Sequence, residues 1–235
     1  MPLSGRSGQG LIGRERKHMK RETCMFKPYA GMLDEFTRAI RAKAEVIQAK
    51  CERLKARNAS AWTVAGFVYF YAEFDDDNKA GLKELLATWR GELAEMGVIL
   101  ALPAEMRLMY HDIGVVREDK HLIRRRVFAT HLKPGCADEY QARHQKLIDA
   151  RGDRVSDGPE TNFTIHCALD EYIFGYCELV KSYDHEMTEE EKASTIAWET
   201  KQLEIMDWYT DDVDWITGQK HEKMQNLFLQ KGYEE

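Results

Sequence analysis

The stretch Arg126-Val-Phe-Ala-Thr-His-Leu-Lys-Pro-Gly-Cys-Ala-Asp-Glu-Tyr-Gln-Ala-Arg-His-Gln-Lys-Leu-Ile148 decides the fold that we expect for this chain. It opens with a run rich in β-forming residues, 127–132, and continues through a Lys-Pro-Gly turn. A helix should follow, because Asp138 and Glu139 are acids in its first turn, where the helix dipole favours negative charge. The stretch therefore predicts a strand, a turn and a helix in succession.

The predicted helix carries two polar rings on the face that should pack against a sheet. Tyr140 and His144 lie four residues apart, so on a helix they share one face with Ala137, Leu147 and Ile148. A phenol and an imidazole on a face that should be apolar make these two residues the first candidates for a functional site.

The order of the predicted elements indicates the fold class. Periodicity and turn residues predict strand, helix, strand, strand, helix and strand at 22–26, 33–56, 61–65, 67–74, 81–95 and 106–110. The same order recurs at 127–132, 137–150, 162–168, 172–180, 188 to about 208–212, and 224–230. Each set has the βαββαβ order of a ferredoxin-like unit. We therefore expect an α+β protein whose two units form an intramolecular dimeric α/β barrel.

Short motifs repeat in the same order, which indicates an internal duplication. The matched pairs are Lys27-Pro28 with Lys133-Pro134, Asp34-Glu-Phe36 with Asp138-Glu-Tyr140, Trp62-Thr-Val with Phe163-Thr-Ile, Tyr71-Ala-Glu-Phe with Tyr176-Cys-Glu-Leu, and Trp89 with Trp198. We expect a disordered leader at 1–18, a degenerate unit at 19–122, and a unit with the site at 123–235. The first unit is called degenerate because Phe36 and Ile40 stand where the second has Tyr140 and His144.

The composition indicates which partners and which cellular compartment to expect. A net charge of −6 gives no reason to expect nucleic acid, and no apolar run approaches the ~20 residues of a membrane span. The five cysteines show no metal-ligand spacing and are expected to be reduced thiols in a cytoplasmic protein.

These motifs resemble the L-rhamnose mutarotase family. The resemblance rests on the strand, the Lys-Pro turn and the Asp-Glu-Tyr-x-x-x-His helix start, and it continues through Asn162-Phe163, the strand ending at Glu178, the helix with Trp198, and Phe228. It covers the C-terminal half, with a weaker correspondence in the N-terminal half. It implies a cofactor-free enzyme that interconverts the anomers of L-rhamnose or a related 6-deoxy sugar.

The resemblance also implies roles for individual residues. His144 would be the catalytic proton donor, with Tyr140 beside it in catalysis and sugar binding. Asn162, Phe163 and Trp198 would contact the sugar. Phe163 stands where the family has a tyrosine, and Trp198 where the family has two adjacent tryptophans.

Several alternatives remain open from the sequence. Trp198 could be core packing, since Trp89 matches it, and Trp208-Tyr209 could supply the sugar platform instead. The protein could be a non-catalytic sugar-binding or scaffold protein. It could also be a barrel oxygenase or metal-assisted enzyme that uses His131, His166 and Glu178, although we predict no metal. A homo-oligomer of pseudo-dimers is also left open.

Overall fold

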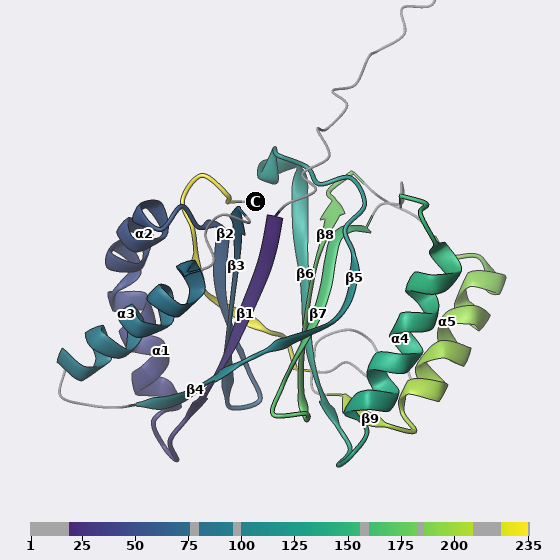
Figure 1. Cartoon of the computed structure of the whole chain (residues 1–235), viewed down its shortest axis with the longest axis horizontal. Coiled ribbons are helices and arrows are strands. Elements are labelled where there is room, and N and C mark those ends of the chain that lie inside the picture. The colour runs from purple at the N-terminus through teal and green to yellow at the C-terminus, as the bar shows by residue number, and fades with distance from the viewer. Residues whose placement is uncertain are drawn as a thin grey trace, which may run out of the picture.

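Two antiparallel sheets face each other in the middle of the protein, with helices on both outer sides (Figure 1). The computed structural model describes residues 19–75, 80–95, 100–155, 160–182, 186–208 and 222–234. The fold is α+β, as the sequence predicts, and has the architecture of a dimeric α/β barrel within one chain.

The first sheet has the strand order β10-β2-β3-β1-β4. Its strands are β1 (Met19–Pro28), β2 (Arg57–Val64), β3 (Phe67–Asp75), β4 (Ala101–Glu105) and β10 (Gln225–Leu229). Helices α1 (Leu33–Ala42), α2 (Ala44–Arg53) and α3 (Gly81–Glu95) cover its outer face (Figure 1). The order β2-β3-β1-β4 is that of a ferredoxin-like sheet.

The second sheet has the matching order β5-β7-β8-β6-β9. Its strands are β5 (Arg107–Asp112), β6 (Ile123–Leu132), β7 (Glu160–Ala168), β8 (Tyr172–Val180) and β9 (Met206–Trp208), and a 3-10 turn, η1 (Lys120–Leu122), precedes β6. Helices α4 (Ala137–Arg151) and α5 (Glu189–Gln202) cover its outer face (Figure 1). Both sheets thus place helices outside and a shared core inside.

The two halves of the chain exchange one strand each. β5 follows β4 in sequence but pairs with β7 of the second sheet, and β10 pairs with β2 of the first. The segments 106–110 and 224–230, predicted as the fourth strand of each unit, are therefore the exchanged strands. The fourth strands are β4 and β9 instead, because these pair with β1 and β6.

Two predicted helices have different lengths in the structure. The helix expected at 33–56 is broken at Lys43 into α1 and α2, and both Ile40 and Ile47 lie in the core. The capping box at Thr188 is present, but α5 ends at Gln202. Residues 206–208, expected in this helix, form β9, because their backbone pairs with the edge of β6.

Strand register also corrects one of the matched pairs. Ser60 pairs with Tyr71 as Thr164 pairs with Tyr176, so Ser60 corresponds to Thr164. Trp62 therefore corresponds to His166 and not to Phe163. The error arose because the triplets Trp62-Thr-Val and Phe163-Thr-Ile are similar, whereas only backbone pairing determines which residues correspond.

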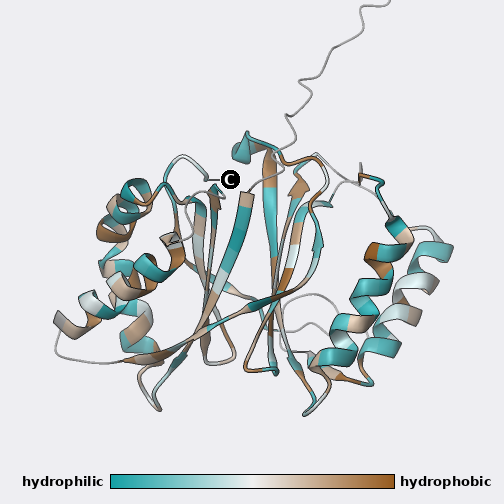
Figure 2. Cartoon of the chain, viewed as in Figure 1, coloured by the Kyte–Doolittle hydropathy of each residue, from teal (hydrophilic) through white to brown (hydrophobic). Residues whose placement is uncertain are grey.

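A polar cluster lies between the sheets, in addition to the apolar core that they share. We call it the inter-sheet polar cluster; it comprises Asn58, Tyr71, Glu73, Asn162, Tyr176 and Glu178, with Arg21, Lys120 and Arg125 around them. The two asparagines sit at the β-bulges with positive φ, 49° and 53°. Figure 2 shows the hydrophilic stretches that the facing strands contribute.

Each carboxylate of this cluster takes hydrogen bonds from both sheets. The Asn58 amide donates to Glu73 Oε1 at 2.7 Å and to Glu178 Oε1 at 3.0 Å. The Asn162 amide donates to the same two oxygens at 2.6 and 2.9 Å. The rings of Tyr71 and Tyr176 stack at 3.9 Å, and burial raises the pKa of both phenols well above the ordinary value. The cluster therefore fixes one sheet against the other.

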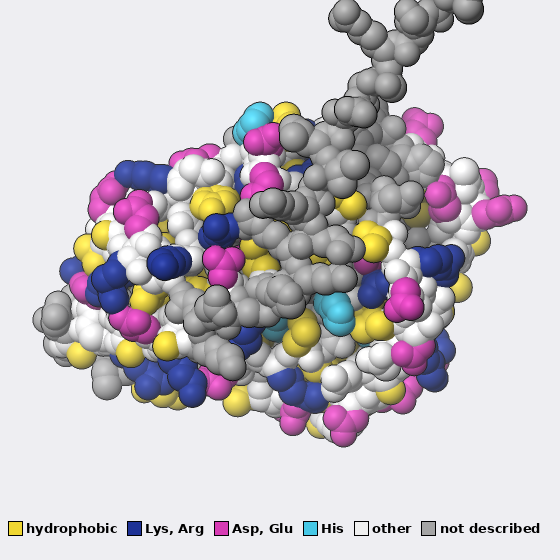
Figure 3. All heavy atoms as spheres, turned by 45° about the horizontal axis from the view of Figure 1, so that its top comes forward, with side chains coloured by type: hydrophobic (Ala, Val, Ile, Leu, Met, Phe, Trp, Pro, Cys, Tyr) yellow, Lys and Arg dark blue, Asp and Glu magenta, His cyan; other side chains and the backbone are white. Residues whose placement is uncertain are grey.

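The outer surface mixes charges of both signs. Figure 3 shows Lys and Arg side chains interspersed with Asp and Glu over the described part of one face. The cysteines Cys24, Cys51, Cys136, Cys167 and Cys177 are free, and all but Cys136 are buried. Among the described helices, none is long and apolar enough to cross a membrane.

The inter-sheet polar cluster makes a stability prediction. Lys120 Nζ binds both carboxylate oxygens of Glu178 at 2.8 and 2.7 Å, and both side chains are almost fully buried. Lys120→Met should lower the free energy of unfolding by about 3–5 kcal/mol in urea titration, because a buried carboxylate loses its cation. Lys192→Met is the control, since its ion pair with Glu189 is on the surface. Equal effects of the two substitutions would contradict this role of Lys120.

Candidate active site

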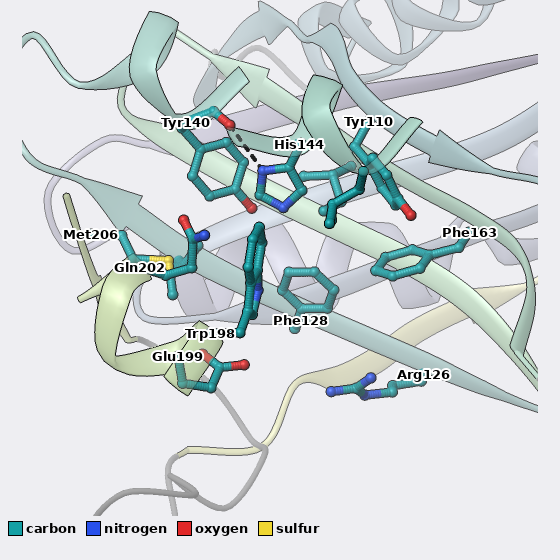
Figure 4. Close-up of a pocket in the computed structure, with 13 residues that line it drawn as sticks. Tyr110, Arg126, Phe128, Tyr140, His144, Phe163, Trp198, Glu199, Gln202 and Met206 are labelled. Atoms are coloured by element: carbon teal, nitrogen blue, oxygen red, sulfur yellow. Dashed lines mark hydrogen bonds between the residues drawn. The ribbon is translucent and has the colours of Figure 1, made fainter. Parts of the chain in front are cut away.

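Helix α4 places Tyr140 and His144 side by side beneath the outer face of the second sheet. Their ring centroids are 4.2 Å apart, and only 3% and 5% of the two residues are exposed. His144 Nδ1 lies 2.9 Å from the carbonyl oxygen of Tyr140. A carbonyl can only accept, so Nδ1 carries the proton and Nε2 keeps its lone pair. Figure 4 shows this second nitrogen facing the enclosed space.

The two rings line a cavity of about 200 Å³ between the second sheet and helices α4 and α5. Its walls are mainly aromatic, formed by Tyr110, Phe128, Tyr140, His144, Phe163 and Trp198 (Figure 4). Polar groups also reach it, from Arg126, Thr130, Glu199 and Gln202. The cavity thus combines flat apolar walls with a few hydrogen-bonding groups, as small-molecule sites usually do.

Aromatic rings fix the position of the imidazole. Trp198 meets His144 edge to face, with centroids 5.4 Å apart and planes at 87°. Tyr110 lies 5.3 Å from the imidazole on another side and also contacts Phe163 at 5.4 Å. Both substrate-contact candidates Phe163 and Trp198 therefore lie at the same cavity as Tyr140 and His144.

Burial sets the protonation state of both central groups. Desolvation lowers the pKa of His144, and the hydrogen bond to the Tyr140 carbonyl opposes this only in part. Desolvation raises the pKa of Tyr140 far above the ordinary value. At neutral pH the site therefore holds a neutral imidazole with a free lone pair and a phenol that keeps its proton. Such a pair can accept and return a proton at a bound hydroxyl.

Asn162 does not lie at the cavity. The bulge in β7 turns its side chain to the inner face of the sheet, where its amide donates to Glu73 and Glu178 and its oxygen accepts from Arg21 Nε at 2.7 Å. Phe163, the next residue, consequently points to the outer face. The structure separates this predicted sugar contact from the other four site residues.

The three residues of the metal alternative do not converge. His131 pairs with Tyr172 and Glu178 lies six residues further along β8, so the two are separated by about 20 Å. His166 is buried between the sheets, and Glu178 belongs to the inter-sheet polar cluster. No group of three or more potential metal-ligating side chains occurs among the residues that the structure describes.

The corresponding place in the first half is filled. Phe26 occupies the strand position that Thr130 has in the second half, and its ring packs against Phe36 at 5.4 Å and Trp89 at 5.7 Å. Ile40 and Trp89 line a remaining hollow of about 20 Å³. Among the described residues of the first half, the place that corresponds to the cavity therefore offers no comparable space.

A second pair of positions, at the cavity floor, carries side chains of different size in the two halves. Cys24 pairs with Phe70 in the first sheet, whereas Phe128 pairs with Gly175 in the second. A Cβ on Gly175 would come within 2.1 Å of the Phe128 ring, so the ring lies directly over the glycine. Only a glycine leaves room for Phe128 in this orientation.

Several residues of the cavity could not be predicted from the sequence. Tyr110 reaches it only because β5 crosses to the second sheet, which no local pattern signals. Gln202 and Met206 line the cavity because α5 ends at Gln202, earlier than the sequence predicts. A glycine within the apolar strand β8 was a usable signal for Phe128, since it marks a close approach. The side chain of Trp208 and the whole of Tyr209 lie outside the described residues.

Comparison with known proteins gives a family for the second half of the chain. Residues 125–229 match the family described as L-rhamnose mutarotase. No curated protein matches the chain.

Similar solved structures have low sequence identity to this chain. A candidate monooxygenase from Fusobacterium nucleatum has 8% identity and a TM-score of 0.43, with 91% of this chain and 92% of that chain covered. A candidate monooxygenase from Lactobacillus acidophilus has 11% identity and a TM-score of 0.38, with 91% and 96% covered. An anthrone oxidase-like protein has 9% identity and a TM-score of 0.36, with 92% and 91% covered.

The contact of Phe128 with Gly175 yields a prediction for the cavity floor. Gly175→Ala should displace the Phe128 ring and lower the free energy of unfolding by about 1–3 kcal/mol, because the added methyl overpacks the sheet surface. Gly91→Ala in α3 is the matched control: its Cβ would meet nothing within 4 Å, and alanine favours the helix by up to about 1 kcal/mol. Urea denaturation of both variants measures the difference. A neutral Gly175→Ala would show that the ring is not confined.

Proposed function

Because residues 125–229 match the L-rhamnose mutarotase family, we propose that this protein is a sugar mutarotase. Its substrate would be L-rhamnose or a related 6-deoxy sugar, whose α and β anomers it interconverts. The observation that carries the proposal is the neutral imidazole of His144, with its free lone pair directed into an aromatic cavity. The cavity, about 200 Å³, is smaller than the ~300–1,000 Å³ of drug-sized pockets, as suits a monosaccharide.

The chemistry needs one proton to move between two oxygens. His144 Nε2 takes the proton of the anomeric hydroxyl; the C1 carbonyl forms as the bond from C1 to the ring oxygen breaks. The imidazolium then gives the proton to the ring oxygen, which yields the open-chain aldehyde. After rotation about the bond from C1 to C2, the same steps run in reverse and close the other anomer.

The surrounding residues would bind and orient the sugar. Tyr140 keeps its proton and so can donate to a sugar oxygen beside the reacting centre. Trp198 and Phe163 supply flat apolar walls for C–H faces of the ring. Asn162 has no part in binding in this proposal, because its amide is held between the sheets.

The proposal extends to the organisation of the chain. We take residues 19–122 and 123–235 as fused, duplicated units, the first kept as a scaffold, in a cytoplasmic protein. The matching strand orders of the two sheets support this view, as does the packing of Phe26 against Phe36 and Trp89 at the place that corresponds to the cavity.

A sugar-binding protein without catalysis is the second candidate. Phe163 in place of a tyrosine, and Trp198 beside Glu199 instead of a second tryptophan, favour it. Saturation-transfer NMR of anomer exchange on a panel of small sugars separates the two, since binding alone leaves the exchange rate at its spontaneous value.

The first functional prediction concerns the two corresponding helix positions. His144→Ala should reduce anomer exchange to the spontaneous rate, because the proton acceptor is removed. Ile40→Ala should leave exchange unchanged and lower the free energy of unfolding by about 2–5 kcal/mol, because it only creates a cavity in the core. Full activity of His144→Ala in the NMR assay would refute the assignment.

The second prediction concerns pH. The reactive form of His144 is neutral, and burial lowers its pKa below the ordinary 6.5. The ratio kcat/KM should therefore be constant at neutral pH and decrease as pH falls below 6.5 through that lowered pKa. A decrease centred at or above 6.5 would contradict a buried, neutral base.

Unfolding must be measured as a control at each pH. Burial also lowers the pKa of His166, to about 4, so between 6.5 and 4 the unfolded chain binds more protons than the folded one. Stability consequently falls with decreasing pH over this window. The melting temperature separates this loss from the titration of His144.

A further inference from the structure

Gln202 has a buried amide that no group of the described chain satisfies. It is the last residue of α5, lines the cavity and is 2% exposed. Neither its Oε1 nor its Nε2 has a hydrogen-bond partner among the residues that the structure describes. Figure 4 shows Gln202 on the side of the cavity where Tyr140 and Trp198 lie. Buried polar side chains are bonded in the large majority of cases, so this exception calls for a partner from outside the chain.

The other buried glutamines among the described residues are satisfied within the core. Gln48 donates to Glu52 Oε1 at 2.7 Å and accepts from the Lys231 amide at 2.9 Å. Gln230 accepts from the Ala59 amide at 3.0 Å and donates to the Ala56 carbonyl at 2.9 Å. Both of these side chains use donor and acceptor within the core, whereas Gln202 uses neither.

The backbone around Gln202 is held firmly although its side chain is not. Arg143 donates to the carbonyl of Lys201 and binds the Glu204 carboxylate at 3.0 Å. Lys133 Nζ donates to the carbonyl of Leu203 at 2.8 Å. Just beyond, β9 pairs with the edge of β6. The amide is therefore presented from a fixed position, which is how a recognition group reduces the entropy lost on binding.

We propose that Gln202 is a specificity-determining residue that binds a ring hydroxyl of the sugar. This rests on the proposed function and deepens it. A hydroxyl donates and accepts, and neighbouring hydroxyls of a neutral sugar can satisfy both amide atoms at once. A carboxylate or phosphate could accept from Nε2 but would leave Oε1 without a donor. The amide thus selects a neutral polyol, and it recognises a position other than the proton-transfer centre at His144.

The test compares L-rhamnose with its 2-, 3- and 4-deoxy analogues. Dissociation constants from ligand-observed NMR titration and anomer exchange rates are measured for wild type and Gln202→Met, which keeps the side-chain length without hydrogen-bonding atoms. Wild type should bind one deoxy analogue about tenfold more weakly than L-rhamnose, the worth of one hydrogen bond. In Gln202→Met the ratio of the dissociation constants of that analogue and L-rhamnose should fall to about one, because L-rhamnose binds more weakly. The KM for L-rhamnose should rise, and kcat should change little.

Two controls separate recognition from structure. Gln145→Met, at an exposed position of α4, should keep the wild-type ratio. Gln48→Met should lower the melting temperature, because it breaks satisfied bonds, whereas Gln202→Met should melt no lower than wild type. An unchanged ratio in Gln202→Met, or a loss of stability as large as that of Gln48→Met, would overturn the inference.

The two proposals fail in distinguishable ways. If wild type binds the sugars but does not speed their anomer exchange, the mutarotase proposal fails, and the binding ratio still decides the role of Gln202. If wild type binds none of the sugars, both proposals are overturned.

Discussion

Two carboxylates buried between the sheets, Glu73 and Glu178, constrain the whole structure. A buried charge must be matched by hydrogen bonds and a cation, and here each half of the chain supplies donors to the carboxylate of the other. Asn58 and Asn162 reach both carboxylates only because a bulge turns each inward. The network joins both sheets by their inner faces, which leaves their outer faces for the helices.

The same framework supports two different outer faces. In the first half Phe26 and Phe70 fill the space between sheet and helices with aromatic rings. In the second half Thr130 and Gly175 stand at these strand positions, which leaves a cavity and moves the ring to Phe128. A cavity costs stability, since its walls lose packing contacts. In the first half the corresponding place is packed with aromatic rings, and the two halves share a core. The packing of the first half can therefore offset the stability that the cavity costs the second half.

Burial also prepares the chemistry of the open half. An imidazole in water is partly protonated near neutral pH, but desolvation keeps His144 neutral, and its bond to the Tyr140 carbonyl determines which nitrogen faces the cavity. Tilted and edge-on aromatic rings hold the imidazole in place. The same low polarity makes an unpartnered amide such as that of Gln202 costly, and hence informative about what the cavity should bind.

Local sequence patterns determined many of the helices and strands of this protein. Helix α3 at 81–95 and strand β8 at 172–180 lie where periodicity predicts them, and the spacing of Tyr140 and His144 placed both on one buried face. These features depend on neighbours a few residues away, which the sequence displays directly. Strand exchange, the bulges, the early end of α5 and the inward turn of Asn162 depend on pairing between distant segments. One extra residue in a strand moves every later side chain to the opposite face of the sheet. Strand register likewise separates His131 from Glu178, and packing places Gln202 at the cavity. Register and packing are properties of the tertiary structure alone.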